Sequence, residues 1–206
     1  MLPSLTLLLA ATLLAITPGP GIAYVVARTA AGGRAEGIAS SLGTAVGGMV
    51  HVLAGALGLS LLIAQSAWAY AVVKYLGAAY LMYLGIRLLA SRAASPEAPL
   101  VQRAGAGKAL RDGIIVEVFN VKTALFFLAF IPQFVSARQP LAPQFILYGT
   151  LCVLLNSLVD LIAVAAASLI LASGTAKAAK ARLLSRLSGA TMLTLGVLVA
   201  VANRNG

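Results

Sequence analysis

The chain has 206 residues, of which 61% are hydrophobic and 10% are charged, and its mean hydropathy is +0.98. Soluble domains contain roughly 45–50% apolar and about 25% charged residues, so this composition excludes a soluble globular protein and predicts an integral membrane protein. The net charge of +10 bears first on topology, because basic residues of membrane proteins gather in cytoplasmic loops. We therefore expect a lipid bilayer around the chain and no nucleic-acid partner.

Six apolar stretches are long enough to span a membrane as helices. They cover residues 4–28, 38–64, 68–90, 113–135, 141–172 and 184–203. None alternates between apolar and polar residues as the strands of a β-barrel do, so the expected fold is all-α with six transmembrane helices. The first seventeen residues lack a basic n-region and an A-x-A site, which predicts mature sequence and not a cleaved signal peptide.

The basic residues predict the orientation of these spans. The loops after the first, third and fifth spans contain Arg28, Arg34, Arg87, Arg92, Arg103, Lys108, Arg111, Lys177, Lys180, Arg182 and Arg186. The opposite side contains only Lys74, Arg138 and Arg204. The positive-inside rule therefore places the three basic loops in the cytoplasm and both termini outside.

The segment ITPGPG interrupts the first span. Pro18 and Pro20 lack an N–H and clash with the preceding turn, so the carbonyl groups of about Leu14 to Ile16 lose their helical partners. The second half of this helix would begin near Gly21 with free N–H groups and a positive dipole end, which suits a carboxylate. We expect Pro18, Gly19, Pro20 and Gly21 to bind substrate; the alternative is a kink or a helix boundary.

Residues 91–112, which are rich in Ala, Pro, Gly and charge, predict a cytoplasmic basic linker. The linker separates two halves, 1–90 and 113–206, with three predicted spans each. Because three is an odd number, related halves would be inverted relative to each other in the membrane, an arrangement common among secondary transporters. The first span of the first half is interrupted at residues 17–21, and the first span of the second half has a polar interruption at residues 117–122. Such matching interruptions point to a substrate site.

The interruption of the fourth span contains Glu117, Asn120 and Lys122. Charged residues within a span cost at least about 2.5–3.5 kcal/mol each, so they are usually paired or face a cavity. Glu117 is a candidate for proton coupling, or it reaches the cytoplasmic edge beside Arg111. Lys122 is expected to bind unwound backbone or a carboxylate, and Asn120 and Lys122 are candidates for substrate binding.

The fifth span carries Asn156 and Asp160 at i, i+4, which places them on one face of a helix. We expect Asn156 to bind substrate and Asp160 to bind the substrate amine or a coupling proton. The alternative for Asp160 is a structural salt bridge to Lys122. Cys152, the only cysteine of the chain, is expected to be a small core residue.

The only histidine, His51, lies in the second span in line with Gly43, Gly47 and Gly55 at i+4 spacing. This stripe predicts close approach of a neighbouring helix. His51 either relays protons or forms a neutral hydrogen bond between helices, and the sequence does not separate these roles.

No enzyme motif is present. The sequence has no Walker lysine loop and no G-x-S-x-G context, and one histidine with one cysteine cannot form a usual zinc centre. We therefore expect a non-enzyme without metal or cofactor. Three alternatives stay open: an exporter of another small solute or a metal cation, a membrane-embedded enzyme if Asp160, Glu117 and His51 converge on one cavity, and a passive channel.

Three stretches resemble the LysE/RhtB family of amino-acid exporters: TPGPGIAYVVARTAAGGRAEGIASSLGTAVGGMVHVLAGALGLS, VVKYLGAAYLMYLGIRLL and FNVKTALFFLAFIPQF. With the fifth span, the similarity covers most of the chain apart from the central linker and the far C-terminus. The resemblance implies a multi-pass inner-membrane protein that exports amino acids or close derivatives by proton antiport. It also suggests a homodimer, which the glycine stripe would permit.

Matched position by position, the family's proline-glycine break falls on Pro18, Gly19 and Pro20, and its asparagine-proline-lysine motif falls on residues 120–122. The central proline of that motif is Val121 here. An unwound break and a polar turn within a continuous helix are therefore both compatible with the fourth span. Asp160 matches the acidic residue of the fifth span.

Overall fold

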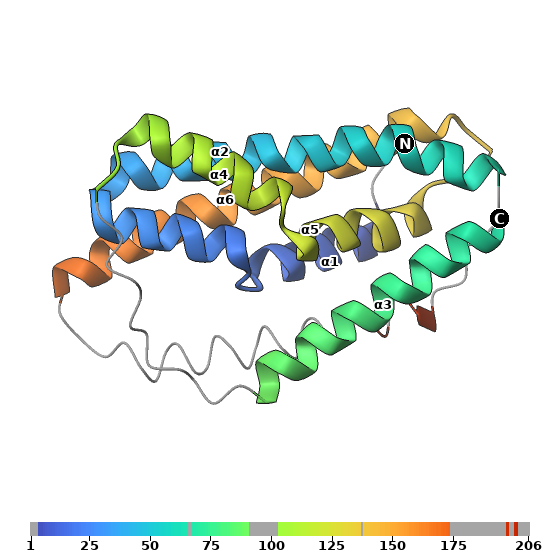
Figure 1. Cartoon of the computed structure of the whole chain (residues 1–206), viewed down its shortest axis with the longest axis horizontal. Helices are drawn as coiled ribbons and strands as arrows, with labels where there is room; N and C mark the ends of the chain where they lie inside the picture. Colours follow the sequence, from blue (N-terminus) through green and yellow to red (C-terminus); the bar gives the residue numbers. More distant parts are fainter. Residues whose placement is uncertain are drawn as a thin grey trace.

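The computed structural model describes residues 4–65, 67–90, 103–136 and 138–173, together with Val197, Ala200 and Val201. Regular structure in these residues is helical throughout, as predicted (Figure 1). The elements are α1 (Leu5–Ile16), α2 (Pro20–Gln65), α3 (Ala67–Ala90), α4 (Ala106–Val118), α5 (Val121–Leu125), a π-helical turn (Phe126–Phe130), a 3₁₀ turn (Ile131–Phe134) and α6 (Leu141–Ser173). Of the predicted sixth span, 184–203, only three helical positions are described.

Two of the described helices are long and apolar enough to cross a membrane, over Pro20–Gly58 and Leu141–Leu169. A third span is formed if Ala106–Val118 and Val121–Phe134, which are bent by 45° relative to each other, count as one. The bent pair begins at Ala106, within the predicted linker, so the fourth helical segment is longer than predicted. The inverted arrangement of two three-helix halves remains a prediction.

The chain reverses direction within α2, at Gly33. Gly33 has φ 76° and ψ −168°, a conformation that glycine adopts at little cost and other residues rarely adopt. The two sides of this turn pack against each other, since an added Cβ on Gly21 would lie 3.7 Å from Thr44 Cγ2. Residues 20–32 form a helix that follows the break after α1. Residues 34–65 form a second helix that runs antiparallel to the first (Figure 1).

The glycine stripe of α2 lets α4 and α6 approach closely. A Cβ added to Gly43 would collide with the Leu110 carbonyl oxygen of α4, and a Cβ added to Gly47 would lie 2.7 Å from Glu117 Cβ. A Cβ added to Gly55 would collide with the Phe145 ring of α6. The close approach predicted from the stripe is therefore confirmed, and its partners belong to the same chain. A homodimer would have to use another surface.

An apolar core surrounds the π-helical turn. Phe126 stacks on Phe130 with 4.8 Å between ring centroids, and both side chains are buried. Leu7 of α1, Val52 of α2 and Phe145 of α6 belong to the same core. The core therefore fixes the segment that follows the α4/α5 break against three other helices.

Candidate functional site

The two predicted interruptions meet in the middle of the bundle (Figure 1). The first separates α1 from α2 at residues 17–19, where Thr17 has an extended conformation before Pro18, as steric crowding by proline favours. The ammonium of Lys122 donates to the carbonyl oxygens of Thr17 at 2.9 Å and Leu14 at 3.3 Å. As expected, Lys122 binds the backbone that the proline break leaves without helical partners.

The second interruption separates α4 from α5, although Val121 stands where the family has proline. Asn120 has an extended conformation, and its side-chain oxygen accepts the backbone N–H of Lys122 at 3.1 Å, as a helix N-cap does. Its side-chain N–H group donates to Glu117 Oε2 at 2.9 Å. Asn120 thus stabilises a real break in the fourth span without a proline.

Glu117 lies inside the bundle with 3% of its surface exposed. Its Oε1 accepts the Thr123 hydroxyl at 2.6 Å, and its Oε2 lies 2.6 Å from where a Cβ on Gly21 would be. The alternative that Glu117 reaches the membrane edge beside Arg111 is therefore wrong. In this conformation the N-terminal turn of α2 faces the carboxylate of Glu117, and the binding of a substrate carboxylate at this turn stays a prediction.

His51 forms a hydrogen bond between helices. Its Nε2 lies 2.8 Å from the backbone carbonyl oxygen of Glu117. This carbonyl also accepts the N–H of Asn120, because the helix does not continue beyond Val118. His51 therefore compensates for the α4/α5 break, which matches the second of its two expected roles, and the bond places a hydrogen on Nε2 because a carbonyl can only accept.

Asp160 of α6 is buried, with 1% of its surface exposed. Its Oδ2 lies 2.9 Å from the hydroxyl oxygen of Thr44 on α2. Within the described part of the chain, Lys122 and Asp160 do not approach within the 4.0 Å of an ion pair. The alternative of a salt bridge between them is therefore wrong for this conformation.

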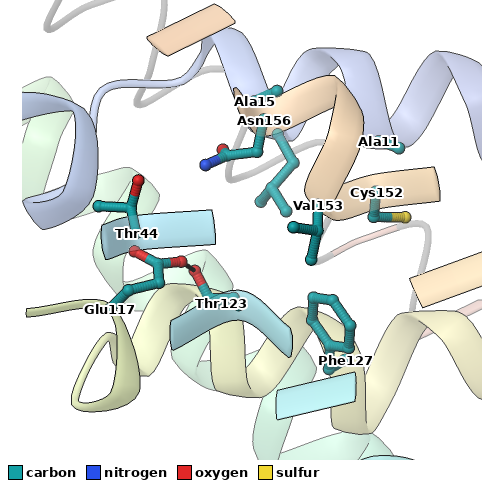
Figure 2. Close-up of a pocket in the computed structure, with 11 residues that line it drawn as sticks. Ala11, Ala15, Thr44, Glu117, Thr123, Phe127, Cys152, Val153 and Asn156 are labelled. Atoms are coloured by element: carbon teal, nitrogen blue, oxygen red, sulfur yellow. Dashed lines mark hydrogen bonds between the residues drawn. The ribbon is translucent and has the colours of Figure 1, made fainter. Parts of the chain in front are cut away.

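A small cavity lies beside the two breaks (Figure 2). Its polar lining comes from Thr44, Glu117, Thr123 and Asn156, and its apolar lining consists of Ala11, Leu14, Ala15, Gly48, Phe127, Cys152 and Val153. About 20 Å³ is open to the centre of a water molecule, which suffices for water and not for an amino acid. Of Asp160, Glu117 and His51, only Glu117 lines this cavity, so the convergence that would favour an enzyme is not found there.

A network of charges connects the helices at the end of the bundle next to the Gly33 turn. The Arg28 guanidinium lies 3.4 Å from Glu36 Oε2 and 3.9 Å from Asp112 Oδ2, which links both sides of the turn to α4. The Tyr24 hydroxyl accepts a hydrogen bond from Arg28 Nε at 3.1 Å. None of these four residues was predicted to belong to the site. In the sequence, Arg28 counted only as one of the basic loop residues that predict the membrane orientation.

Glu36 also holds the beginning of α4. Its Oε1 accepts the backbone N–H groups of Ala104 and Gly105 at 2.9 and 2.8 Å. These N–H groups precede the first turn of α4 and have no helical partner of their own. The Glu36 carboxylate therefore joins the α2 turn to the chain that leads into the fourth span.

The sequence did not single out Thr44 and Thr123. Threonine is common in membrane helices, and its hydroxyl usually bonds to the backbone of its own helix. They could have been identified only from their contacts with Asp160 and Glu117. Predicting these contacts requires knowledge of which helices face each other.

Interrupted helices that meet beside a buried polar cavity in a membrane protein are a feature of secondary transporters. The chain belongs to the LysE type translocator family, whose model matches residues 12–203. This confirms the family predicted from the resemblance. Membership in a family of translocators agrees with the expectation of a non-enzyme.

Named relatives of this chain are efflux proteins. It is 30% identical to the homoserine/homoserine lactone efflux protein of Salmonella typhimurium, over 74% of each chain. It is 32% identical to the leucine efflux protein of Klebsiella pneumoniae, over 71% of each chain. An uncharacterised membrane protein of Pseudomonas aeruginosa is 30% identical over 96% of this chain and 94% of its own. No solved structure matches the chain.

Proposed function

We propose that this protein exports amino acids with neutral side chains, or their close derivatives, from the cytoplasm by proton antiport across the inner membrane. The observation that carries the proposal is the meeting of two helix breaks at the cavity lined by Thr44, Glu117, Thr123 and Asn156. Two relatives are named for the efflux of homoserine, its lactone and leucine, which supports this substrate class.

The substrate site consists of the turn at Pro18, Gly19, Pro20 and Gly21 with Asn120, Lys122 and Asn156. Glu117 and Lys122 already place a carboxylate at the start of α2 and an ammonium at the end of α1. A substrate zwitterion carries the same two charged groups, so we infer that it replaces these contacts when the cavity opens. The space of about 20 Å³ supports a closed conformation in this proposal, which alternating access between the two halves would open.

The cavity lining supports neutral side chains over cationic ones. Among the described lining residues, Glu117 alone has a carboxyl group, and this group is already hydrogen-bonded to Asn120 and Thr123. The rest of the lining is apolar apart from two hydroxyl groups and one carboxamide. A second ammonium on the substrate would therefore lose its hydration without gaining a free partner.

Asp160 carries the coupling proton in this proposal, and Glu117 and His51 are further candidates for proton coupling. A proton that enters while a zwitterion leaves moves one charge down the membrane potential, which provides about 2.3 kcal/mol per 100 mV. This corresponds to more than a tenfold concentration ratio. In this proposal the Gly33 end of the bundle faces the cytoplasm and both termini lie outside, an orientation that the distribution of basic residues supports.

Counterflow in proteoliposomes tests the proposal. Purified protein is reconstituted and assayed with a labelled panel that includes homoserine, leucine and lysine, with and without an imposed pH gradient. We expect exchange of the neutral amino acids, and uphill transport only when the gradient is present. Labelling of Cys152, which lines the cavity, should slow when an exchanged amino acid is added. The absence of any exchange by correctly folded protein would contradict the proposal.

A further inference from the structure

The Thr44 hydroxyl has two partners and a single proton. Its oxygen lies 2.8 Å from the carbonyl oxygen of Ser41 and 2.9 Å from Asp160 Oδ2. A carbonyl can only accept, and an ionised carboxylate can only accept as well. With an ionised Asp160, Thr44 could therefore make only one of the two hydrogen bonds. With a protonated Asp160, the carboxyl donates to Thr44 and Thr44 donates to Ser41, so both contacts are hydrogen bonds.

Thr44 also separates Asp160 from the cavity. Thr44 lines the cavity, whereas Asp160 does not and is 1% exposed. The Thr44 hydroxyl is the one hydrogen-bond partner of the Asp160 side chain within the described residues. A proton that moves between the cavity and Asp160 therefore meets Thr44 first.

The other ionisable groups near Asp160 have different partners. Glu117 of α4 and Lys122 of α5 are the charged groups that act on it electrostatically, and neither forms an ion pair with it. Glu117 bonds to Asn120 and Thr123, and Lys122 bonds to backbone carbonyl groups. His51 lies two helical turns beyond Thr44 on α2 and bonds to the Glu117 carbonyl. None of them offers Asp160 a second direct route to the cavity.

We propose that Thr44 is the positioning residue through which Asp160 exchanges its proton with the cavity. The hydroxyl turns from the Ser41 carbonyl to a water in the cavity and gives it the Thr44 proton, while Thr44 accepts the proton of Asp160 Oδ2. The step leaves Asp160 ionised, Thr44 neutral and the water as hydronium, and its reverse protonates Asp160. The space of about 20 Å³ admits that water.

The inference rests on the proposed function, because proton antiport gives the exchange its use. Thr44→Val removes the hydroxyl at nearly constant volume, and Thr44→Ser keeps it. Thr12→Val is the matched control, since the Thr12 hydroxyl bonds to the Leu8 carbonyl within α1 and has no acidic partner. Each variant is reconstituted and assayed for counterflow at equal pH and for uphill transport driven by a pH gradient, over a series of pH values.

We expect Thr44→Val to lose about tenfold or more of the gradient-driven rate relative to its own counterflow rate, as the removal of a positioned proton-transfer group does. Its rate should also lose the pH dependence of the wild type. Thr44→Ser and Thr12→Val should behave as the wild type. A Thr44→Val protein with the wild-type pH profile and gradient-driven rate would overturn the inference, as would equal loss of both activities in Thr44→Val and Thr44→Ser.

An infrared measurement separates this inference from the proposed function. Asp160→Asn should remove a protonated-carboxyl band from the spectrum of the wild-type protein, and Thr44→Val should shift that band and slow its hydrogen–deuterium exchange. These shifts in a protein that transports no amino acid would leave the role of Thr44 standing and reject the proposed function. If no band depends on Asp160, or if Thr44→Val leaves the band unchanged, the role of Thr44 is rejected.

Discussion

The ammonium of Lys122 lies 2.9 Å from the carbonyl oxygen of Thr17, 105 residues earlier in the chain. The contact joins the two helix breaks, because Thr17 precedes Pro18 and Lys122 follows Asn120 in the first turn of α5. A further hydrogen bond to Leu14 at 3.3 Å supports it. One side chain thus satisfies two carbonyl groups that the proline break exposes inside the bundle.

Replacement of Lys122 by Met should destabilise the protein, because the buried Thr17 carbonyl loses its ammonium donor and the Leu14 carbonyl is left with the backbone N–H of Thr17. An unsatisfied buried polar group costs about 1–3 kcal/mol, which lowers the unfolding midpoint by on the order of 5 °C for a chain of this size. The midpoint is measured by thermal unfolding in detergent. Lys108→Met is the control, since Lys108 is exposed, and an equal midpoint in both variants would contradict the role of the Lys122 contacts.

Gly113→Ala should separate α4 from α2. The added Cβ would lie 2.7 Å from the Ser40 carbonyl oxygen and 3.3 Å from Gly43 Cα, and neither backbone group can turn away. Overpacking of this kind costs about 1–3 kcal/mol. Gly107→Ala in the same helix has nothing within 4 Å of the added Cβ and should be neutral or slightly stabilising. The two thermal midpoints, compared with the wild type, measure the difference; a Gly113→Ala protein as stable as Gly107→Ala would argue against this close packing.

Asp160→Asn should uncouple transport from the proton gradient. The amide keeps a polar partner for Thr44 and cannot release a proton. Counterflow of labelled amino acid should continue at equal pH, while uphill transport under a pH gradient is lost. A variant that still concentrates its substrate would remove Asp160 from the coupling step, and Asn156→Asp, four residues earlier on α6, tests whether a carboxyl at that place can restore coupling.

Glu36→Gln should make the cavity more accessible from the end of the bundle that contains the Gly33 turn. The amide replaces a carboxylate oxygen that now faces Arg28 and weakens the bonds to Ala104 and Gly105. A loss of about 1.4 kcal/mol raises the open population about tenfold. The rate at which maleimide labels Cys152, the only cysteine of the chain and a cavity residue, reports the change. Arg34→Gln, an exposed substitution beside the same turn, should leave the rate unchanged; equal rates in all three proteins would mean that the network does not hold this end closed.

The sequence predicted the helical breaks better than the contacts between them. Two prolines fix the break after Ile16 by sterics alone, so the local sequence suffices there. The second break depends on Asn120, whose side chain acts as an N-cap in place of the expected proline, and a single asparagine is compatible with several local structures. The hairpin at Gly33 was predicted only as a loop, because nothing local shows that Gly33 takes a positive φ.

The site itself required the tertiary structure. Asp160 and Thr44 are 116 residues apart in the chain, and the Arg28 network joins α2 to the beginning of α4. Charge alone indicated that Glu117, Lys122 and Asp160 need partners, but it did not identify them, and the alternative of a Lys122–Asp160 salt bridge is not formed among the described residues. The partner of each charged group depends on which helix faces meet. The close contacts of Gly43 and Gly47 with α4 determine which faces of α2 and α4 pack together.

Glu117 and Lys122 lie at the same junction, the first as acceptor of two side-chain hydrogen bonds and the second as donor of two bonds to carbonyl groups. The opposite charges of a carboxylate and an ammonium cancel at the centre of the substrate-free bundle. In the proposed antiport, a carrier that returns with this pair intact and with a protonated Asp160 moves no net charge across the bilayer, so this return step would be electrically silent. Voltage would then act on the substrate-loaded step alone, and a change of voltage would alter the export rate only while that step limits it.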